Sequence, residues 1–96
     1  MRRKNDIKKI IKGSRNADQV IVLIEECSEL IKEMTKALRG EGSQKRIAEE
    51  LGDVQLMIYQ ACIIFNIDPA VLDEVIDWKV DRTLKKMEEE KNDKSE

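Results

Sequence analysis

The expected fold is decided by residues 20–38, which have the sequence VIVLIEECSELIKEMTKAL. Apolar side chains recur in this stretch at spacings of three and four residues, the period of an amphipathic α-helix. They are Val20, Leu23, Ile24, Cys27, Leu30, Ile31, Met34 and Leu38. Asn16 is a candidate N-cap and Gly40 a candidate C′ residue, so the pattern predicts a helix from about residue 16 to residue 39.

Similar patterns lie on both sides of this helix. Isoleucines at helical spacing predict a short helix over residues 3–12, and a broad apolar surface predicts a long helix over residues 43–65. Asp68 as N-cap and Pro69 as the first helical residue predict a fourth helix. Residues 40–43 form a flexible connector. A phosphate-binding loop is the alternative there, but it lacks a preceding strand and a Gly-Lys-Ser/Thr ending.

These elements predict an all-α fold, an antiparallel bundle of three long helices plus a short N-terminal helix. We expect a single domain over residues 1–88 and a charged, disordered tail over residues 89–96. A chain of 96 residues has little core for a deep pocket of its own. We therefore expect the bundle to be completed by oligomerisation, as a homodimer or a homotetramer.

Composition excludes several classes of function. A formal net charge of −2 and an aromatic content of 3% argue against a nucleic-acid partner. No apolar run approaches the roughly 18 residues that cross a membrane, so no membrane partner is expected. Cys27 and Cys62 lie in apolar stretches, which is typical of free thiols in a reducing compartment and favours a cytoplasmic location.

The chain contains no histidine. This absence excludes histidine-based nucleophilic pairs, histidine general catalysis and histidine-containing zinc sites. Any metal chemistry must then rest on carboxylates, which select hard ions such as Mg²⁺ or Mn²⁺.

Two carboxylate pairs carry the candidate chemistry. Glu26 and Glu29 are three residues apart in one predicted helix, and Glu50 and Asp53 are three apart in the next, so each pair shares a helix face. Each pair lies beside an apolar stripe, and packing the two stripes together would bring four mutually repelling carboxylates into contact. A divalent cation would relieve that repulsion. The alternatives are a solvated glutamate-rich face and a structural ion-pair network.

Residues 24–30, IEECSEL, and residues 49–54, EELGDV, resemble the MazG-like all-α nucleoside triphosphate pyrophosphohydrolases. The family signature is Glu-Glu-x-x-Glu, then a variable gap, then Glu-x-x-Asp. The resemblance covers about residues 16–85 and departs from the common pattern at Ser28, where many relatives have glycine. It implies a Mg²⁺-dependent enzyme that hydrolyses a nucleoside triphosphate, or its deoxy form, to the monophosphate and pyrophosphate in nucleotide-pool clearance.

The resemblance also implies roles for single residues. The Mg²⁺ ligands that it implies are Glu26, Glu29, Glu50 and Asp53. Mn²⁺ is the alternative ion for these ligands. The resemblance makes Glu25 an accessory carboxylate that orients or deprotonates the attacking water.

The resemblance further implies that Lys79 and Arg82 hold the substrate phosphates. The alternative for these two residues is an ordinary solvated pair on an amphipathic helix. Trp78 and Tyr59 are expected in the core or at an interface, with stacking on a base as the alternative. For the whole chain, the alternative function is a non-catalytic helical oligomerisation or regulatory module.

Overall fold

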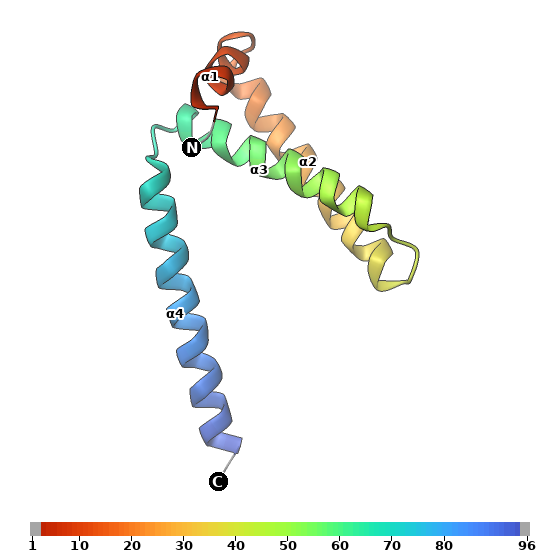
Figure 1. The fold of residues 1–96 in the computed structure, drawn as a ribbon, viewed down its shortest axis with the longest axis vertical. Helices are drawn as coiled ribbons and strands as arrows, with labels where there is room; N and C mark the ends of the chain where they lie inside the picture. The colour runs from red at the N-terminus through yellow and green to blue at the C-terminus, as the bar shows by residue number, and fades with distance from the viewer. Residues whose placement is uncertain (1–2, 95–96) are drawn as a thin grey trace. The chain divides into compact units, whose positions relative to one another are not determined.

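The computed structural model describes residues 3–94, which form four α-helices and contain no strand (Figure 1). The helices are α1 (Lys4–Lys12), α2 (Asn16–Leu38), α3 (Gln44–Ile64) and α4 (Pro69–Lys94). The all-α class, with three long helices and one short N-terminal helix, is confirmed. The chain divides into two compact units, Met1–Asn66 with α1 to α3 and Ile67–Glu96 with α4, and each is described by itself.

In the first unit, α2 and α3 lie side by side as an antiparallel pair joined by residues 39–43 (Figure 1). The short connection turns the chain back on itself, as the sequence predicted. The side of α3 that packs against α2 and α1 contributes the buried Met57 and Cys62, and α1 contributes the buried Ile7. Cys62 and the half-buried Cys27 are free thiols, in agreement with the sequence.

Local capping explains where the helices end. The hydroxyl of Ser43 accepts a hydrogen bond from the backbone N–H of Arg46 at 3.1 Å and caps α3. The carboxylate of Asp68 accepts one from the backbone N–H of Ala70 at 2.9 Å, directly before Pro69 begins α4. Asn66 has a φ of 56°, which is the left-handed conformation expected after α3.

Two expectations differ from the structure. Asn16, the predicted N-cap of α2, is instead its first residue, and Arg15 is the capping residue. The Arg15 guanidinium pairs with the Asp18 carboxylate at 3.1 Å across the first turn, so charge rather than an asparagine amide supports this end. The disordered tail expected from residue 89 is also not observed, because α4 continues through Lys94. Glutamate and lysine are good helix formers, which outweighs the loss of apolar periodicity there. Residues 95–96 of that tail lie outside the described residues.

Within residues 3–94, no single helix is long and apolar enough to cross a membrane, and only α3 and α4 counted together as one broken segment meet that criterion.

Candidate metal centre

Three of the predicted ligands come together where the middle of α2 faces the first half of α3. Glu26 lies on α2, and Glu50 and Asp53 lie one turn apart on α3. Each offers a carboxylate oxygen, and these three oxygens lie within 4.8 Å of one another. Glu26 and Glu50 are half-buried and Asp53 is exposed, so the cluster is open to solvent on one side.

The electrostatics of this cluster are unfavourable for three bare carboxylates. Partial burial, followed by the negative charges of Asp53 and Glu50, raises the pKa of Glu26 above its ordinary 4.5. Partial burial, followed by the charges of Asp53, Glu29 and Glu33, raises the pKa of Glu50 in the same direction. Both shifts mean that the folded chain resists placing full negative charge here.

Glu50 also presents an unsatisfied oxygen. Its Oε2 atom is buried and has no hydrogen-bond partner among the described residues. A buried acceptor without a partner is costly, so such an atom calls for a ligand or for protonation. A hard divalent cation fits this oxygen-only donor set, because Mg²⁺ and Mn²⁺ prefer carboxylate ligands and leave positions for water or phosphate.

The fourth predicted ligand, Glu29, lies near the cluster but not within its closest group. Its side chain is exposed, and its charge raises the pKa of both Glu26 and Glu50. Glu25, the predicted accessory carboxylate, is exposed on α2 one residue before Glu26. Consecutive helical residues point about 100° apart, so Glu25 lies to one side of the three clustered oxygens.

A sixth carboxylate, which was not predicted from the sequence, lies beside the site. Glu33 is only 8% exposed, and its Oε1 lies 3.5 Å from the ammonium of Lys36. Its Oε2 is buried and has no hydrogen-bond partner within residues 3–94. Its charge contributes to the raised pKa of Glu50. The signal in the sequence is the spacing of four residues from Glu29, which keeps Glu33 on the same face of α2.

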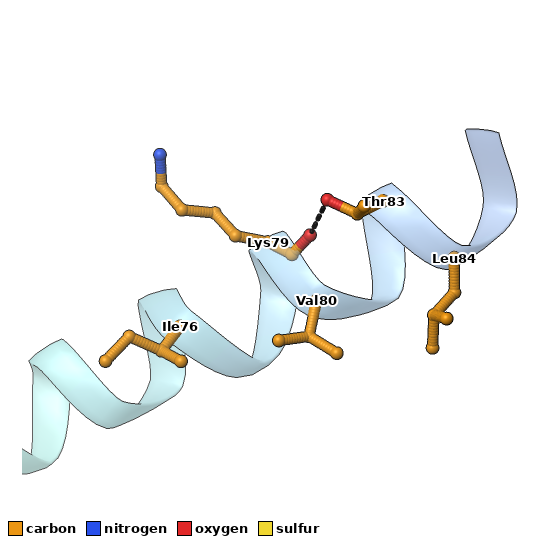
Figure 2. A pocket seen from close by; sticks show the side chains of 5 residues that line it. All are labelled: Ile76, Lys79, Val80, Thr83 and Leu84. Atoms are coloured by element: carbon orange, nitrogen blue, oxygen red, sulfur yellow. Dashed lines mark hydrogen bonds between the residues drawn. The ribbon is translucent and has the colours of Figure 1, made fainter. Parts of the chain in front are cut away.

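The predicted phosphate-binding residues lie on α4, in the second unit. The guanidinium of Arg82 lies 5.1 Å from the centre of the Trp78 ring, a cation–π contact that holds both side chains on one face of the helix. Trp78 is 58% exposed, so this ring is not part of the described core. Lys79 is exposed, and its backbone carbonyl accepts a hydrogen bond from the Thr83 hydroxyl at 2.8 Å (Figure 2).

An apolar strip also runs along α4. Figure 2 shows it on the opposite side of the helix from the extended Lys79 side chain, as Ile76, Val80 and Leu84. All three are about half exposed, which is unusual for a row of large apolar residues in a monomer.

Comparison with known proteins gives a match to one family model. Residues 16–93 match the model of the MazG nucleotide pyrophosphohydrolase domain, which covers all of α2 and α3 and nearly all of α4. Neither a curated protein nor a solved structure matches the chain.

Proposed function

The chain belongs to the MazG nucleotide pyrophosphohydrolase family, and we propose that it hydrolyses nucleoside triphosphates, ribo or deoxy, to the monophosphate and pyrophosphate with Mg²⁺ as cofactor. The observation that carries the proposal is the cluster of Glu26, Glu50 and Asp53, whose carboxylate oxygens lie within 4.8 Å of one another. An enzyme of this class must neutralise the phosphate charge and position a water molecule, and a carboxylate-held divalent cation does both.

We assign Glu26, Glu50 and Asp53 as ligands of the cation, with Glu29 completing the set from the edge of the cluster. When bound, Mg²⁺ polarises the phosphoryl oxygens and lowers the pKa of a coordinated water. The raised pKa values of Glu26 and Glu50 and the unpartnered Glu50 Oε2 support this assignment, because a cation would relieve both.

Two further roles are proposed for residues outside the cluster. Glu25, exposed beside Glu26, accepts a hydrogen bond from the attacking water and orients it toward the α-phosphorus. Lys79 and Arg82 donate charge-assisted hydrogen bonds to the phosphates that leave as pyrophosphate. The three-residue spacing of Lys79 and Arg82 on α4 supports a shared ligand.

We also propose that the protein acts as a homodimer or homotetramer in the cytoplasm. The half-exposed strip of Ile76, Val80 and Leu84 supports self-association, because such strips are covered in stable proteins. Two free cysteines support a reducing compartment. Clearance of unwanted nucleotides is the biological role that this activity would serve.

A pyrophosphate-release assay tests the reaction. Wild type would be incubated with Mg²⁺ and a panel of canonical and modified nucleoside triphosphates, beside Glu50→Gln, Glu29→Gln and the control Glu49→Gln. Glu49 is exposed on the same helix and lies outside the cluster, so its variant removes one charge without removing a proposed ligand. We expect Mg²⁺-dependent release that falls about 100-fold or more in Glu50→Gln and Glu29→Gln and stays near wild type in Glu49→Gln.

Other outcomes would redirect the assignment. No release from any nucleotide by folded protein with Mg²⁺ would contradict the proposed activity and favour a non-catalytic helical module. Equal losses in Glu49→Gln and Glu50→Gln would show that general charge on α3, and not the cluster, governs the rate.

A further inference from the structure

A buried pair of amides joins α2 to α3 away from the carboxylates. The Gln60 Nε2 atom donates a hydrogen bond to Gln19 Oε1 at 2.6 Å, and the two residues are 3% and 5% exposed. Gln19 Nε2 donates in turn to the backbone oxygen of Ile11 at 3.0 Å and to the Ser14 hydroxyl at 2.8 Å. One hydrogen-bonded chain therefore connects the end of α1, the start of α2 and the second half of α3.

This amide pair lies in register with the carboxylate cluster. Glu26 follows Gln19 by seven residues along α2, and Asp53 precedes Gln60 by seven residues along α3. Seven residues are about two helical turns, so each glutamine shares a helix face with one carboxylate. Because α2 and α3 are antiparallel, the pairing that puts Gln19 against Gln60 also puts Glu26 opposite Asp53.

Apolar packing alone specifies this pairing weakly. Apolar contacts are not directional, and side chains that repeat every three or four residues present similar ridges after a shift of one turn. Such a shift moves one helix about 5.4 Å along the other. That displacement exceeds the 4.8 Å span of the three carboxylate oxygens and would take the cluster apart. A buried hydrogen bond is directional, and shifting it would strand two amides without partners.

We propose that Gln19 and Gln60 are positioning residues that hold α2 and α3 in the register in which Glu26, Glu50 and Asp53 bind one divalent cation. The inference rests on the proposed metal site. It assigns to two residues outside the acidic motif the role of setting the distance between its two halves.

The test replaces both amides by apolar side chains of similar size, in Gln19→Met/Gln60→Met. Removing both partners leaves no buried amide stranded. The backbone oxygen of Ile11 still accepts a hydrogen bond from the backbone N–H of Ser14, and the exposed Ser14 hydroxyl can form a hydrogen bond with water. We therefore expect a melting temperature within about 5 °C of wild type. We expect Mn²⁺ affinity, measured by titration calorimetry, to fall about tenfold or more, as when groups that orient metal ligands are removed.

Met57→Leu is the matched control, because Met57 is buried on α3 between Asp53 and Gln60 and forms no part of the amide chain. This variant changes the packing between α2 and α3 at nearly constant side-chain volume and should keep the wild-type Mn²⁺ affinity. Equal weakening in the control and the double variant would overturn the positioning role. So would a double variant that binds Mn²⁺ as wild type does, or one that does not fold.

A second readout needs no metal. Nitroxide labels carried by unnatural amino acids at the exposed Thr35 and Gln55 report the distance between α2 and α3 by pulsed electron paramagnetic resonance. Labelled protein would be diluted into unlabelled protein, so that distances within one chain dominate. We expect one narrow distance in wild type and a second population shifted by about 5 Å in the double variant. An unchanged distance would overturn the inference. Failure of wild type to bind Mn²⁺ would contradict the proposed function. The distance measurement alone would then test whether the two glutamines set the register of α2 and α3.

Discussion

At the scale of single residues, the cluster sets a trade-off between apo stability and cation binding. Partial burial and neighbouring charge raise the folded-state pKa of Glu26 and Glu50 above the ordinary value of 4.5. The folded state therefore binds protons more tightly than the unfolded state. The contribution of these groups to the free energy of unfolding is fully present below pH 4.5 and is lost as the pH rises through their raised pKa values.

This linkage predicts the behaviour of Glu50→Gln. Without divalent ions, we expect wild type to lose thermal stability as the pH rises from about 4 to about 7, and Glu50→Gln to lose less of it. Adding Mg²⁺ at neutral pH should stabilise wild type and have little effect on the variant, because a ligand stabilises only the state that binds it. Calorimetric melting over this pH range, with and without Mg²⁺, checks both parts. Glu49→Gln should follow wild type, and identical pH profiles for wild type and Glu50→Gln would contradict the prediction.

Lys79 carries a second prediction at this scale. If its ammonium binds the substrate phosphates, Lys79→Ala should raise KM about tenfold or more, which corresponds to the loss of one charge-assisted hydrogen bond. Steady-state kinetics with the best nucleotide of the panel measures this change. Lys86→Ala, an exposed lysine seven residues further along the same helix, is the control and should keep the wild-type KM. A KM for Lys79→Ala equal to that of the control would contradict phosphate binding by Lys79 and favour the alternative, an ordinary solvated lysine.

The sequence predicted the charged part of the site better than its buried polar part. Glu26, Glu50 and Asp53 could be placed together because each lies beside an apolar stripe and the i, i+3 spacing fixes its face. Gln19 and Gln60 could not be found in this way. Each is polar in its own helix, and each becomes buried only through a partner 41 residues away. Glu33 was missed because glutamate is common on solvated helix faces, and its burial depends on packing against α3.

At the scale of elements, the N-cap of α3 determines where this helix begins after the connection from α2. Ser43 is the N-cap of α3 after a short connection, and its hydroxyl accepts a hydrogen bond from the backbone N–H of Arg46. We expect Ser43→Ala to lower the free energy of unfolding by about 1 kcal/mol, or the melting temperature by about 4–8 °C. Thermal melting at fixed protein concentration measures the change. Ser28→Ala is the control, because Ser28 is exposed inside α2 and alanine is a good helix former there. Equal losses in both variants would contradict a capping role for Ser43.

Helix bounds followed from the sequence where a cap had a clear chemical signal. Ser43, Asn66 and the Asp68–Pro69 pair marked ends that the structure confirms to within one residue. The start of α2 was displaced by one residue, because an arginine can occupy a cap position when its side chain pairs with the first turn. The end of α4 was misjudged because hydrophobic periodicity reports burial, and an exposed helix of lysine and glutamate has none.

At the scale of the whole molecule, the antiparallel pairing of α2 and α3 could be predicted because a connection of five residues permits little else. The sequence predicted that other copies complete the apolar surface, but not which side chains meet between the copies. Among the apolar residues that the structure describes, the short chain buries only Ile7, Met57 and Cys62. Ile24 and Ile31 on α2 remain 64% and 65% exposed. Apolar side chains that stay exposed to water lower stability, so a further surface is expected to cover them. Hydrophobic periodicity identifies the apolar face of a helix but not the surface that covers it.

The apolar strip on α4 leads to a prediction about self-association. Val80 lies at the centre of the strip between Ile76 and Leu84 and is 50% exposed, so a self-associating protein would bury it against another copy. A carboxylate at that position would have to be desolvated on association without a partner charge, which opposes assembly. We expect wild type to have two or four times the single-chain mass of 11.1 kDa, and Val80→Asp to shift toward the single-chain mass. Size-exclusion chromatography with light scattering measures both.

Lys86→Gln is the matched control for this experiment, because it changes the net charge by the same amount at an exposed position outside the strip. It should keep the wild-type mass. Circular dichroism should show that Val80→Asp remains helical, since an isolated aspartate on an exposed face costs helix stability only a few tenths of a kcal/mol. A wild type with the single-chain mass would contradict self-association. An assembled Val80→Asp would show that the copies do not meet at Val80, because an aspartate at a buried contact would have separated them.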